Sequence, residues 1–192
     1  AAGKFGAQFP ITAREAAEGM DRLAACGFNA TQAIGAMPGI IEAAVASGED
    51  LGATSDVVTS ALSIWNLTTG DIAANTIHVA DVIQAAANAS KLGMQDFGLA
   101  MQYAGAPAAA LGISIEDLGT AMGIMSNNGI AASSIGTSLR STLSRLASPP
   151  KAAADALVQL GISMSDLQKG DGSFIGLSGA VDLLRRRMEG LS

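Results

Sequence analysis

The sequence predicts an all-α fold, a compact multi-helix domain in which short helices are joined at glycine corners. A glycine followed by a bulky apolar residue recurs along the chain, usually with a small polar residue close behind. Glycine adopts the left-handed conformation that closes a helix, and the apolar residue after it folds back onto the last turn. Asn or Ser can then cap the next helix. The recurring tripeptides are Gly27-Phe28-Asn29, Gly93-Met94-Gln95, Gly112-Ile113-Ser114, Gly129-Ile130-Ala131 and Gly161-Ile162-Ser163.

Composition agrees with a single domain built largely from small side chains. The chain has 192 residues, of which 49% are hydrophobic and 4% aromatic. That length supports one well-buried core, and the shortage of aromatic rings predicts helices that approach one another closely. We expect residues 1–10 to be an N-terminal lead-in and residues 11–192 to form the helical domain. Because the first residue is not Met, we expect the chain to be a fragment of a longer protein.

The first two helices have clear boundaries. Thr12 and Glu15 have the spacing of a capping box and predict a helix that ends at Gly27. A second helix is predicted over residues 31–48. Pro38 lacks a backbone donor, so we expect this helix to be bent or restarted there.

The next two helices are separated by a polar stop. Asp50 opens the third helix and Asn66 ends it. Trp65 is the only tryptophan and is predicted to anchor the core. Thr68 or Thr69 is predicted to cap the fourth helix.

Three more helices follow in the middle of the chain. The fifth is predicted after Gly93, with a kink at Pro107. Ser114 is positioned to cap the sixth helix. The seventh is predicted after Gly129.

The last quarter of the chain begins with its strongest break. Pro149 and Pro150 follow Ser148, and proline restricts the residue before it. An eighth helix is predicted over residues 151–160 and a final helix over about residues 178–189. Between them a small β-hairpin near residues 162–175 could be closed by Lys169-Gly170-Asp171-Gly172. The spacing from helix to helix is uneven, so a regular solenoid is not expected.

The corners are the most specific local feature of the sequence. Each is expected to fold the chain back on itself, which shortens the distance that the chain spans. The predicted structural corners are Gly27, Pro38, Gly93, Gly112, Gly129, Pro149 and Gly161.

Charge argues against specific nucleic-acid binding. The net charge is -6 and the pI is about 4.6, whereas a nucleic-acid surface needs clustered Lys and Arg. The run Arg185-Arg186-Arg187 follows two leucines on a helical pattern and is predicted to be a solvated helix end. Cys26 is the only cysteine, so it has no partner for an internal disulfide. Its position beside two alanines favours a small core residue over a reactive thiol.

One uncharged stretch, residues 118–139, keeps a second function class open. It contains Gly119 and Gly123 at the spacing that lets membrane helices touch. A membrane-active or pore-forming helical module is therefore the alternative. The polar run Ser126-Asn127-Asn128 lowers the apolar content of this stretch and favours a soluble helix pair with a tight crossing.

The sequence predicts no catalytic, cofactor-binding or metal-binding residues. His78 is the only histidine, and Asp81 lies three residues later, close enough on a helix to form a surface pair. A zinc site needs three or four ligands, and a nucleophilic triad needs an activated Ser or Cys with a base and an orienting acid. We therefore predict that the chain is not an enzyme, and a hydrolase that uses His78 and Asp81 is a weaker third alternative.

Three segments have distinctive sequences: LAACGFNA at residues 23–30, AAALGISIED at residues 108–117, and the run from GTSLR to LASPPKAA within residues 136–153. They resemble the core domain of bacteriophage and prophage tail tape measure proteins. The likeness covers roughly residues 11–192. Pro150 stands where that family often has a polar residue, which should change the break little.

The resemblance implies a structural virion protein that is packed inside the phage tail tube. It implies that the full protein sets tail length, takes part in tail assembly and leaves ahead of the genome during ejection. Implied partners are other copies of the chain as a homo-oligomer, tail tube subunits and tail-end proteins. The resemblance also implies membrane contact during infection and a host cytoplasmic stage during assembly. Some members carry peptidoglycan-cleaving domains, but the Glu-Ser pair of a lytic transglycosylase does not occur in this chain.

Overall fold

The structure is a computed structural model that describes residues 1–170 and 174–189. The described residues form ten α-helices and one 3-10 helix, which confirms the predicted all-α fold. The helices are α1 (Ala2–Gln8), α2 (Ala13–Ala25), α3 (Ala30–Ser47), α4 (Leu51–Ile64), α5 (Ile72–Ala89), α6 (Met94–Ala110), α7 (Ile115–Asn127), α8 (Ala132–Ala147), α9 (Lys151–Gln159) and α10 (Leu177–Met188), and the 3-10 helix is η1 (Met164–Leu167).

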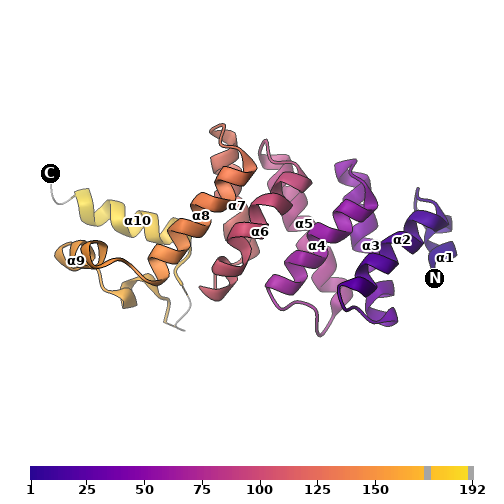
Figure 1. Cartoon of the computed structure of the whole chain (residues 1–192), viewed down its shortest axis with the longest axis horizontal. Helices are drawn as coiled ribbons and strands as arrows, with labels where there is room; N and C mark the ends of the chain where they lie inside the picture. The colour runs from indigo at the N-terminus through magenta and orange to yellow at the C-terminus, as the bar shows by residue number, and fades with distance from the viewer. Residues whose placement is uncertain (171–173, 190–192) are drawn as a thin grey trace.

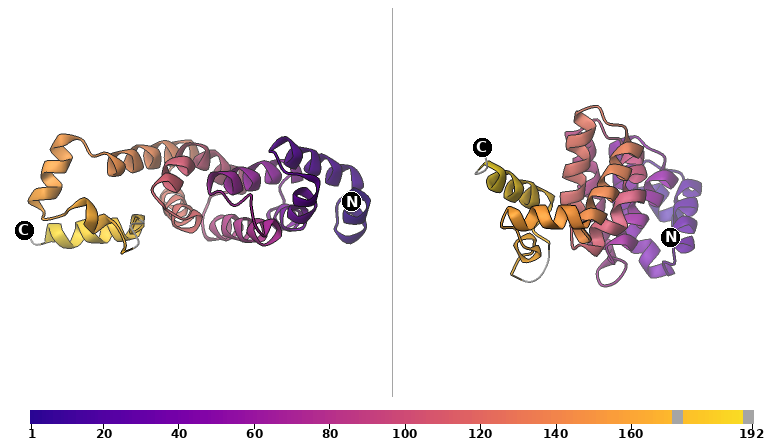
Figure 2. Two further views of the ribbon diagram at one scale, coloured as in Figure 1. Left: turned by 90° about the horizontal axis from the view of Figure 1, so that it is seen from below. Right: turned by 60° about the vertical axis from the view of Figure 1, so that its left-hand side comes forward.

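The helices follow one another along a long axis, with α1 and α10 at opposite ends (Figure 1). α2, α4, α6 and α8 pack side by side in one layer, and α3, α5 and α7 pack side by side in a second layer. From α2 to α8 each helix also packs against the next one in the chain, so the connections cross between the layers (Figure 2). The first eight helices are therefore a stack of antiparallel hairpins with α1 packed on α2.

The repeat of the hairpins is more regular than the sequence suggests. α2, α4, α6 and α8 begin at residues 13, 51, 94 and 132, so successive starts lie 38, 43 and 38 residues apart. The spacing from one helix to the next, which is uneven in the sequence, did not reveal this repeat of helix pairs. Individual helices between α2 and α8 vary from 13 to 18 residues. Each helix packs on the second helix after it in the chain, and this packing sets the combined length of two successive helices and their loops.

One hydrogen-bond pattern closes the helices at the glycine corners. At Gly112, where φ is 71°, the amide donates to the carbonyl of Ala109 at 3.0 Å. The amide of Ile113 donates to the carbonyl of Ala108 at 2.9 Å, and the Ile113 side chain is buried. This is the Schellman arrangement, which satisfies the last carbonyls of a helix. The same pattern with positive φ recurs at Gly27, Gly129 and Gly161.

Two corners depart from this glycine pattern. Asn66 has a φ of 56° and closes α4 in the same way as the glycines, because its amide bonds to Ser63 and the amide of Leu67 bonds to Leu62. Gly93 has a φ of -71° and lies at the start of α6. It begins a helix without closing one, so it does not need the left-handed conformation.

α3 continues through Pro38, so the helix is not restarted there; a bend at Pro38 stays a prediction. Proline removes one helical hydrogen bond, but close packing on α5 holds the chain in helical form on both sides. A Cβ at Gly39 would lie 3.1 Å from Cγ1 of Ile77. Pro107 likewise lies inside α6, whereas Pro149 does stand between two helices, α8 and α9.

The start of α5 also differs from the prediction. Its cap is Asp71, whose carboxylate accepts a hydrogen bond from the amide of Ala74 at 3.1 Å. The predicted caps, Thr68 and Thr69, precede the helix. Asn75 donates its side-chain amide to the carbonyl of Thr69 at 3.1 Å and so holds this loop outside the helix.

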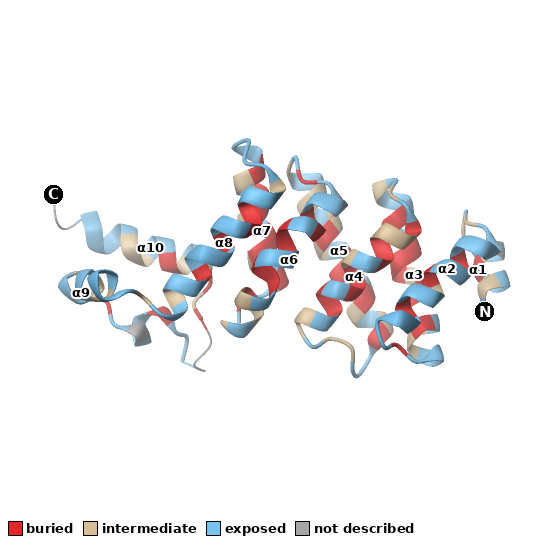
Figure 3. Ribbon diagram, in the orientation of Figure 1, coloured by how far each residue is buried: buried red, intermediate tan, exposed pale blue. Residues whose placement is uncertain are grey.

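The core lies between the two layers and runs along the stack (Figure 3). Phe97 on α6 is its largest fully buried side chain. A Cβ at Gly119 would lie 3.2 Å from Cε2 of Phe97, and a Cβ at Gly123 would lie 3.3 Å from Cβ of Ser90 on α5. The two glycines thus lie where α7 approaches Phe97 and Ser90 closely. Among the described helices, none is long and apolar enough to cross a membrane.

The C-terminal segment packs less tightly than the stack. α9 has no buried residue, and Ala180 is the only one in α10. The expected β-hairpin is reduced, within the described residues, to one antiparallel bridge between Gln168 and Phe174. Residues 164–167, part of which was expected in its first arm, form η1. Asp171 and Gly172, which were expected in the turn, lie outside the described residues.

Candidate functional site

The candidate catalytic pair of the sequence is not formed. Nε2 of His78 lies 2.8 Å from Oε1 of Glu116, across the contact between α5 and α7. Asp81 is therefore not its ion-pair partner, because α7 brings a carboxylate closer than the next turn of α5 does. Both side chains of the observed pair are about half exposed. In residues 1–170 and 174–189 no three His, Cys, Asp or Glu side chains are grouped to hold a metal ion.

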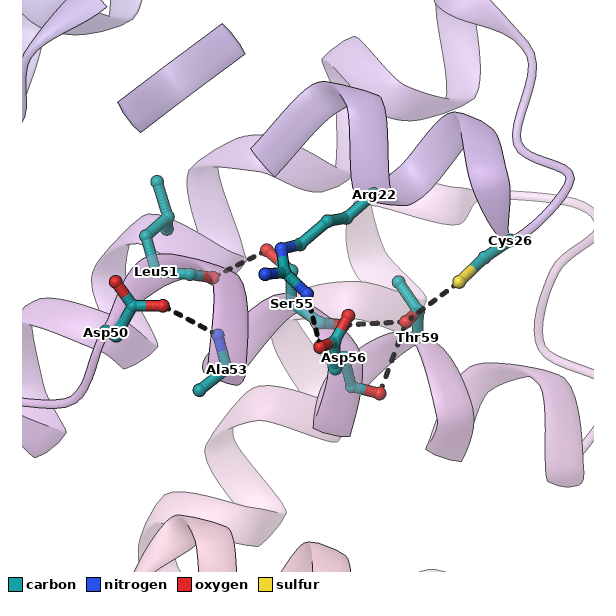
Figure 4. Close-up of polar contacts among 8 residues, drawn as sticks. All are labelled: Arg22, Cys26, Asp50, Leu51, Ala53, Ser55, Asp56 and Thr59. Carbon is teal, nitrogen blue, oxygen red and sulfur yellow. Dashed lines mark hydrogen bonds and ion pairs between the residues drawn. The ribbon is translucent and has the colours of Figure 1, made fainter. Parts of the chain in front are cut away.

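Polar contacts between α2 and α4 form the first candidate interaction site (Figure 4). Nη1 of Arg22 lies 2.6 Å from Oδ2 of Asp56. Sγ of Cys26 donates to Oγ1 of Thr59 at 3.5 Å, and that hydroxyl donates to the carbonyl of Ser55 at 2.7 Å. Cys26 is exposed, so the prediction of a small core residue is wrong. It lies at the C-cap of α2, beyond the last turn that packs inward.

A groove of about 620 Å³ lies between α4 and α6, next to these polar contacts. Its apolar lining includes Val57, Ile64 and Leu99. Gly98 allows the two helices to approach, since a Cβ there would lie 2.6 Å from Cγ2 of Val57. Asp56 is the only charged residue in the lining, and Arg22 compensates it. The groove suits apolar packing and offers no acid–base pair for catalysis.

A hollow of about 400 Å³ between α2 and the start of α4 is strongly acidic. We call it the acidic hollow; its charged lining consists of Glu15, Glu18, Asp21, Arg22 and Asp50. Its lining contains four carboxylates and one guanidinium. That guanidinium is paired with Asp56 of α4, and Glu18 is paired with Arg14 at 2.9 Å. The potential of the hollow therefore favours a cationic partner.

The capping box at the start of α2 controls one carboxylate of this hollow. The Thr12 amide donates to Oε2 of Glu15 at 2.7 Å, and the Glu15 amide donates to the Thr12 hydroxyl at 3.2 Å. The bond from the Thr12 amide, followed by that from its hydroxyl, lowers the pKa of Glu15, while the nearby charge of Asp50 opposes this shift. Glu15 is thus held ionised by the box predicted from the sequence.

Trp65 connects two helix corners. Its Nε1 donates to the carbonyl of Ile113 at 2.9 Å, and so ties the corner after α4 to the corner after α6. Its ring is partly buried and packs against the edge of the core. The predicted core anchor therefore lies at the rim of the core, where its polar edge has a partner.

Charge is divided unequally along the stack. Residues 1–131 contain 12 acidic and 4 basic residues, a net charge of -8, whereas residues 132–192 contain 5 acidic and 7 basic residues, a net charge of +2. The first group ends before α8 begins. The two ends of the elongated molecule therefore differ in electrostatic character (Figure 1).

Sequence reasoning missed the interhelical partners at this site. Arg22 pairs with Asp56 and His78 with Glu116, at sequence separations of 34 and 38 residues. Trp65 bonds to Ile113 at a separation of 48. These separations are close to the length of one hairpin repeat. The repeat would have indicated candidates for each partner had it been recognised in the sequence.

Comparison with known proteins identifies a family. A family model for phage-related minor tail proteins matches residues 1–192. A tape measure protein of Pneumococcus phage Dp-1 is 36% identical over 188 residues, which cover 98% of this chain and 16% of that protein. A probable tape measure protein of Escherichia phage P2 is 35% identical over 89 residues, 46% of this chain and 11% of that protein. The chain thus spans a small part of these relatives. No solved structure gives a significant match.

Proposed function

This chain belongs to the phage-related minor tail protein family, and we propose that it is the helical core domain of a tape measure protein. Residues 11–192 form the domain and residues 1–10 lead into it. The observation that carries the proposal is the 36% identity to the Dp-1 tape measure protein, which extends over 98% of the chain. The role is structural: the chain packs helices against one another and against other tail components.

The stacked hairpins restrict how this domain contributes to tail length. A continuous α-helix gains about 1.5 Å per residue. Neighbouring packed helices lie about 10 Å apart, so a hairpin repeat of about 40 residues gains only about 0.25 Å per residue along the stack. We therefore assign this domain the role of a folded module, and place the length-setting rod in other parts of the full protein.

The proposed surroundings follow from the same family. The domain lies inside the tail tube of the virion, after assembly in the host cytoplasm, and its partners are tube subunits, tail-end proteins and further copies of the chain. It takes part in tail assembly and leaves during genome ejection. The net charge of -6 supports a position in a channel for DNA, since like charge repels phosphate.

Tail length tests the role as a folded module. Removing α4 and α5 with their loops, residues 51–93, takes one hairpin repeat out of the full tape measure protein. A folded module predicts failed tail assembly or a length change of no more than about 10 Å. A continuous ruler predicts intact tails shortened by about 65 Å, and that result in electron micrographs would overturn the proposal.

Virion composition and enzymatic activity test the remaining parts of the proposal. Peptides of this chain should be found by mass spectrometry in purified tails, and their absence from tails would exclude a virion role. The purified chain should not clear a peptidoglycan gel. Clearing that disappears after one carboxylate is replaced would exclude a purely structural role.

A further inference from the structure

α10 is the last helix that the structure describes, and its contact with the stack is small. It packs on α7, the last helix of the second layer, and lies toward the end of the molecule (Figure 2). Ala180 is the one buried residue of α10. With Phe174, just before the helix, it belongs to the same core cluster as the stack. Val181 and Met188 are 63% and 58% exposed, so little apolar surface holds α10 in place.

A carboxylate of the stack lies where α10 begins. A Cβ at Gly176, the N-cap residue of α10, would lie 2.8 Å from Oδ2 of Asp117 on α7. Gly176 leaves room for this carboxylate because it has no side chain, and its φ of 87° is one that glycine adopts readily. α10 has no side-chain cap. Asp117 therefore places a negative charge at the positive end of the α10 dipole.

Asp117 differs from the residues at the same position of earlier helices. It is the third residue of α7, and in α2 and α3 the side chain of the third residue accepts a hydrogen bond from the amide of its own N-cap residue. In α7 the hydroxyl of Ser114 accepts from the amide of Asp117 at 3.2 Å, but the reverse bond is not formed. The carboxylate of Asp117 is thus not used to cap its own helix and faces α10.

The other end of α10 has its polar contacts within the C-terminal segment. Arg185 contacts the carboxylate of Asp182 at 3.4 Å, and Arg186 donates to the carbonyl of Asp182 at 3.2 Å. A Cβ at Gly161, just after α9, would lie 3.7 Å from Nη1 of Arg187. None of these contacts is made with the stack, so α10 can leave α7 without breaking them.

We propose that Asp117 holds the start of α10 on the stack, and that α10 is a releasable strap, which opens from α7 as one unit while the stack stays folded. Opening breaks the small apolar contact and separates the carboxylate from the helix start, but it leaves the layers from α2 to α8 in place. Elements with little buried surface open at a lower free energy than the whole fold. Opening uncovers the surface of α7 on which α10 packs. This movement is independent of the role that the protein has in the tail.

Amide hydrogen exchange, followed by mass spectrometry on the purified chain, tests the strap. The amides of α10 should exchange together and at least about tenfold faster than those of α6. Exchange of both helices at one rate would show that α10 opens only when the whole chain unfolds, and would overturn the strap. Exchange of α10 at the rate of an unstructured peptide would also overturn it, because the stack would then not hold the helix.

A neutral variant tests the part that Asp117 plays. Asp117→Asn removes the charge and nearly keeps the size, and it should speed exchange in α10 about two- to fivefold without a change in α6. Glu116→Gln is the matched control, because it removes the same charge one residue earlier on α7. It also breaks the half-exposed pair with His78, which contributes little, and should leave exchange in α10 unchanged. No effect of Asp117→Asn, or an equal effect of Glu116→Gln, overturns the role of Asp117.

A second variant separates the hold on α10 from the stability of α7. In Asp117→Gln the new side chain can complete a capping box with Ser114, so the global melting temperature should not fall, yet α10 should again exchange about two- to fivefold faster. Faster exchange that comes only with a lower melting temperature would mean that Asp117 acts by stabilising α7, and would overturn the proposal. Raising NaCl from about 0.05 M to about 0.5 M should speed exchange in α10 of the original chain. An equal effect of salt in Asp117→Asn would contradict the electrostatic contact.

Discussion

The helix stack from α2 to α8 and the C-terminal segment from α9 to α10 use similar helices in different ways. Every helix of the stack has at least three buried residues, whereas α9 has none and α10 has one. The stack is therefore stabilised by packing between layers. An isolated helix as short as α9 is marginal in water, and neither α9 nor α10 has a side-chain cap. The C-terminal segment therefore depends on the capping box of η1 and on a few contacts made by the residues around it.

Charge changes sign one helix earlier, within the stack. The helices from α1 to α7 carry the acidic excess, and the chain from α8 onward carries a small basic excess. A region with an apolar interior needs no partner to be stable, whereas a region with exposed apolar side chains and cations presents a surface for one. The comparison indicates a stack stabilised by its own core and a C-terminal segment with exposed apolar side chains.

The largest expected effect is Phe97→Ala in the stack. Phe97 is fully buried and lies against Gly119, where no side chain is present to fill the space that the ring would leave. The expected loss in the free energy of unfolding is about 3–5 kcal/mol, measured by urea denaturation. Phe97→Leu serves as the control and should lose much less. A loss below about 1 kcal/mol for the alanine variant would mean that the core is not packed as described.

The next effect distinguishes two glycine corners within the stack. Gly112→Val forces a β-branched residue to a φ of 71° and should cost about 1–3 kcal/mol. Gly93→Val is the matched control, because Gly93 has a φ of -71° and a Cβ there would meet no atom closer than 4.0 Å. It should stay within about 1 kcal/mol of the original chain. Equal melting temperatures for the two variants would contradict the assignment of the left-handed corner.

A matched pair of valines compares the stack directly with the C-terminal segment. Val58 on α4 is 0% exposed and Val158 on α9 is 74% exposed. Val58→Ala should lower the free energy of unfolding by about 1–3 kcal/mol, whereas Val158→Ala should change it by less than about 0.5 kcal/mol. Similar losses at the two positions would show that α9 is covered in solution and would remove the contrast between the regions.

Local signals predicted most of the helix boundaries, because they act within a few residues. The capping box at Thr12 and the Schellman corner at Gly112 are each formed by residues no more than five apart. The restart considered at Pro38 does not occur, for a long-range reason. The contact of Gly39 with Ile77 is made 38 residues away, and local propensity contains no information about it.

The candidate site was predictable to a smaller extent. The sequence indicated an acidic surface and a cationic helix end at Arg185–Arg187, but it could not show that they lie at opposite ends of a stack. Spacing along one helix predicted that His78 pairs with Asp81. The observed partner, Glu116, lies on another helix. Partners on neighbouring helices of one layer are separated by about one hairpin repeat, and that repeat is set by packing between helices.

The smallest expected effect concerns acid titration of similar capping boxes in the two regions. Glu15 bonds to Thr12 at the start of α2, and Asp166 bonds to Ser163 at the start of η1; these bonds lower the pKa of each carboxyl. A depressed pKa in the folded state contributes stability above the unfolded value, which is about 4 for both groups, and that stability is lost as pH falls through the folded pKa.

The two boxes should therefore be distinguished by their neutral variants. Glu15→Gln should reduce the difference in global melting temperature between pH 7 and pH 3, because α2 is packed into the stack. Asp166→Asn should leave the global transition unchanged and speed amide hydrogen exchange in η1 and α9 at pH 7. If Asp166→Asn shifts the global transition as much as Glu15→Gln does, the C-terminal segment unfolds together with the stack. Its small buried surface would then still be enough to couple the two regions.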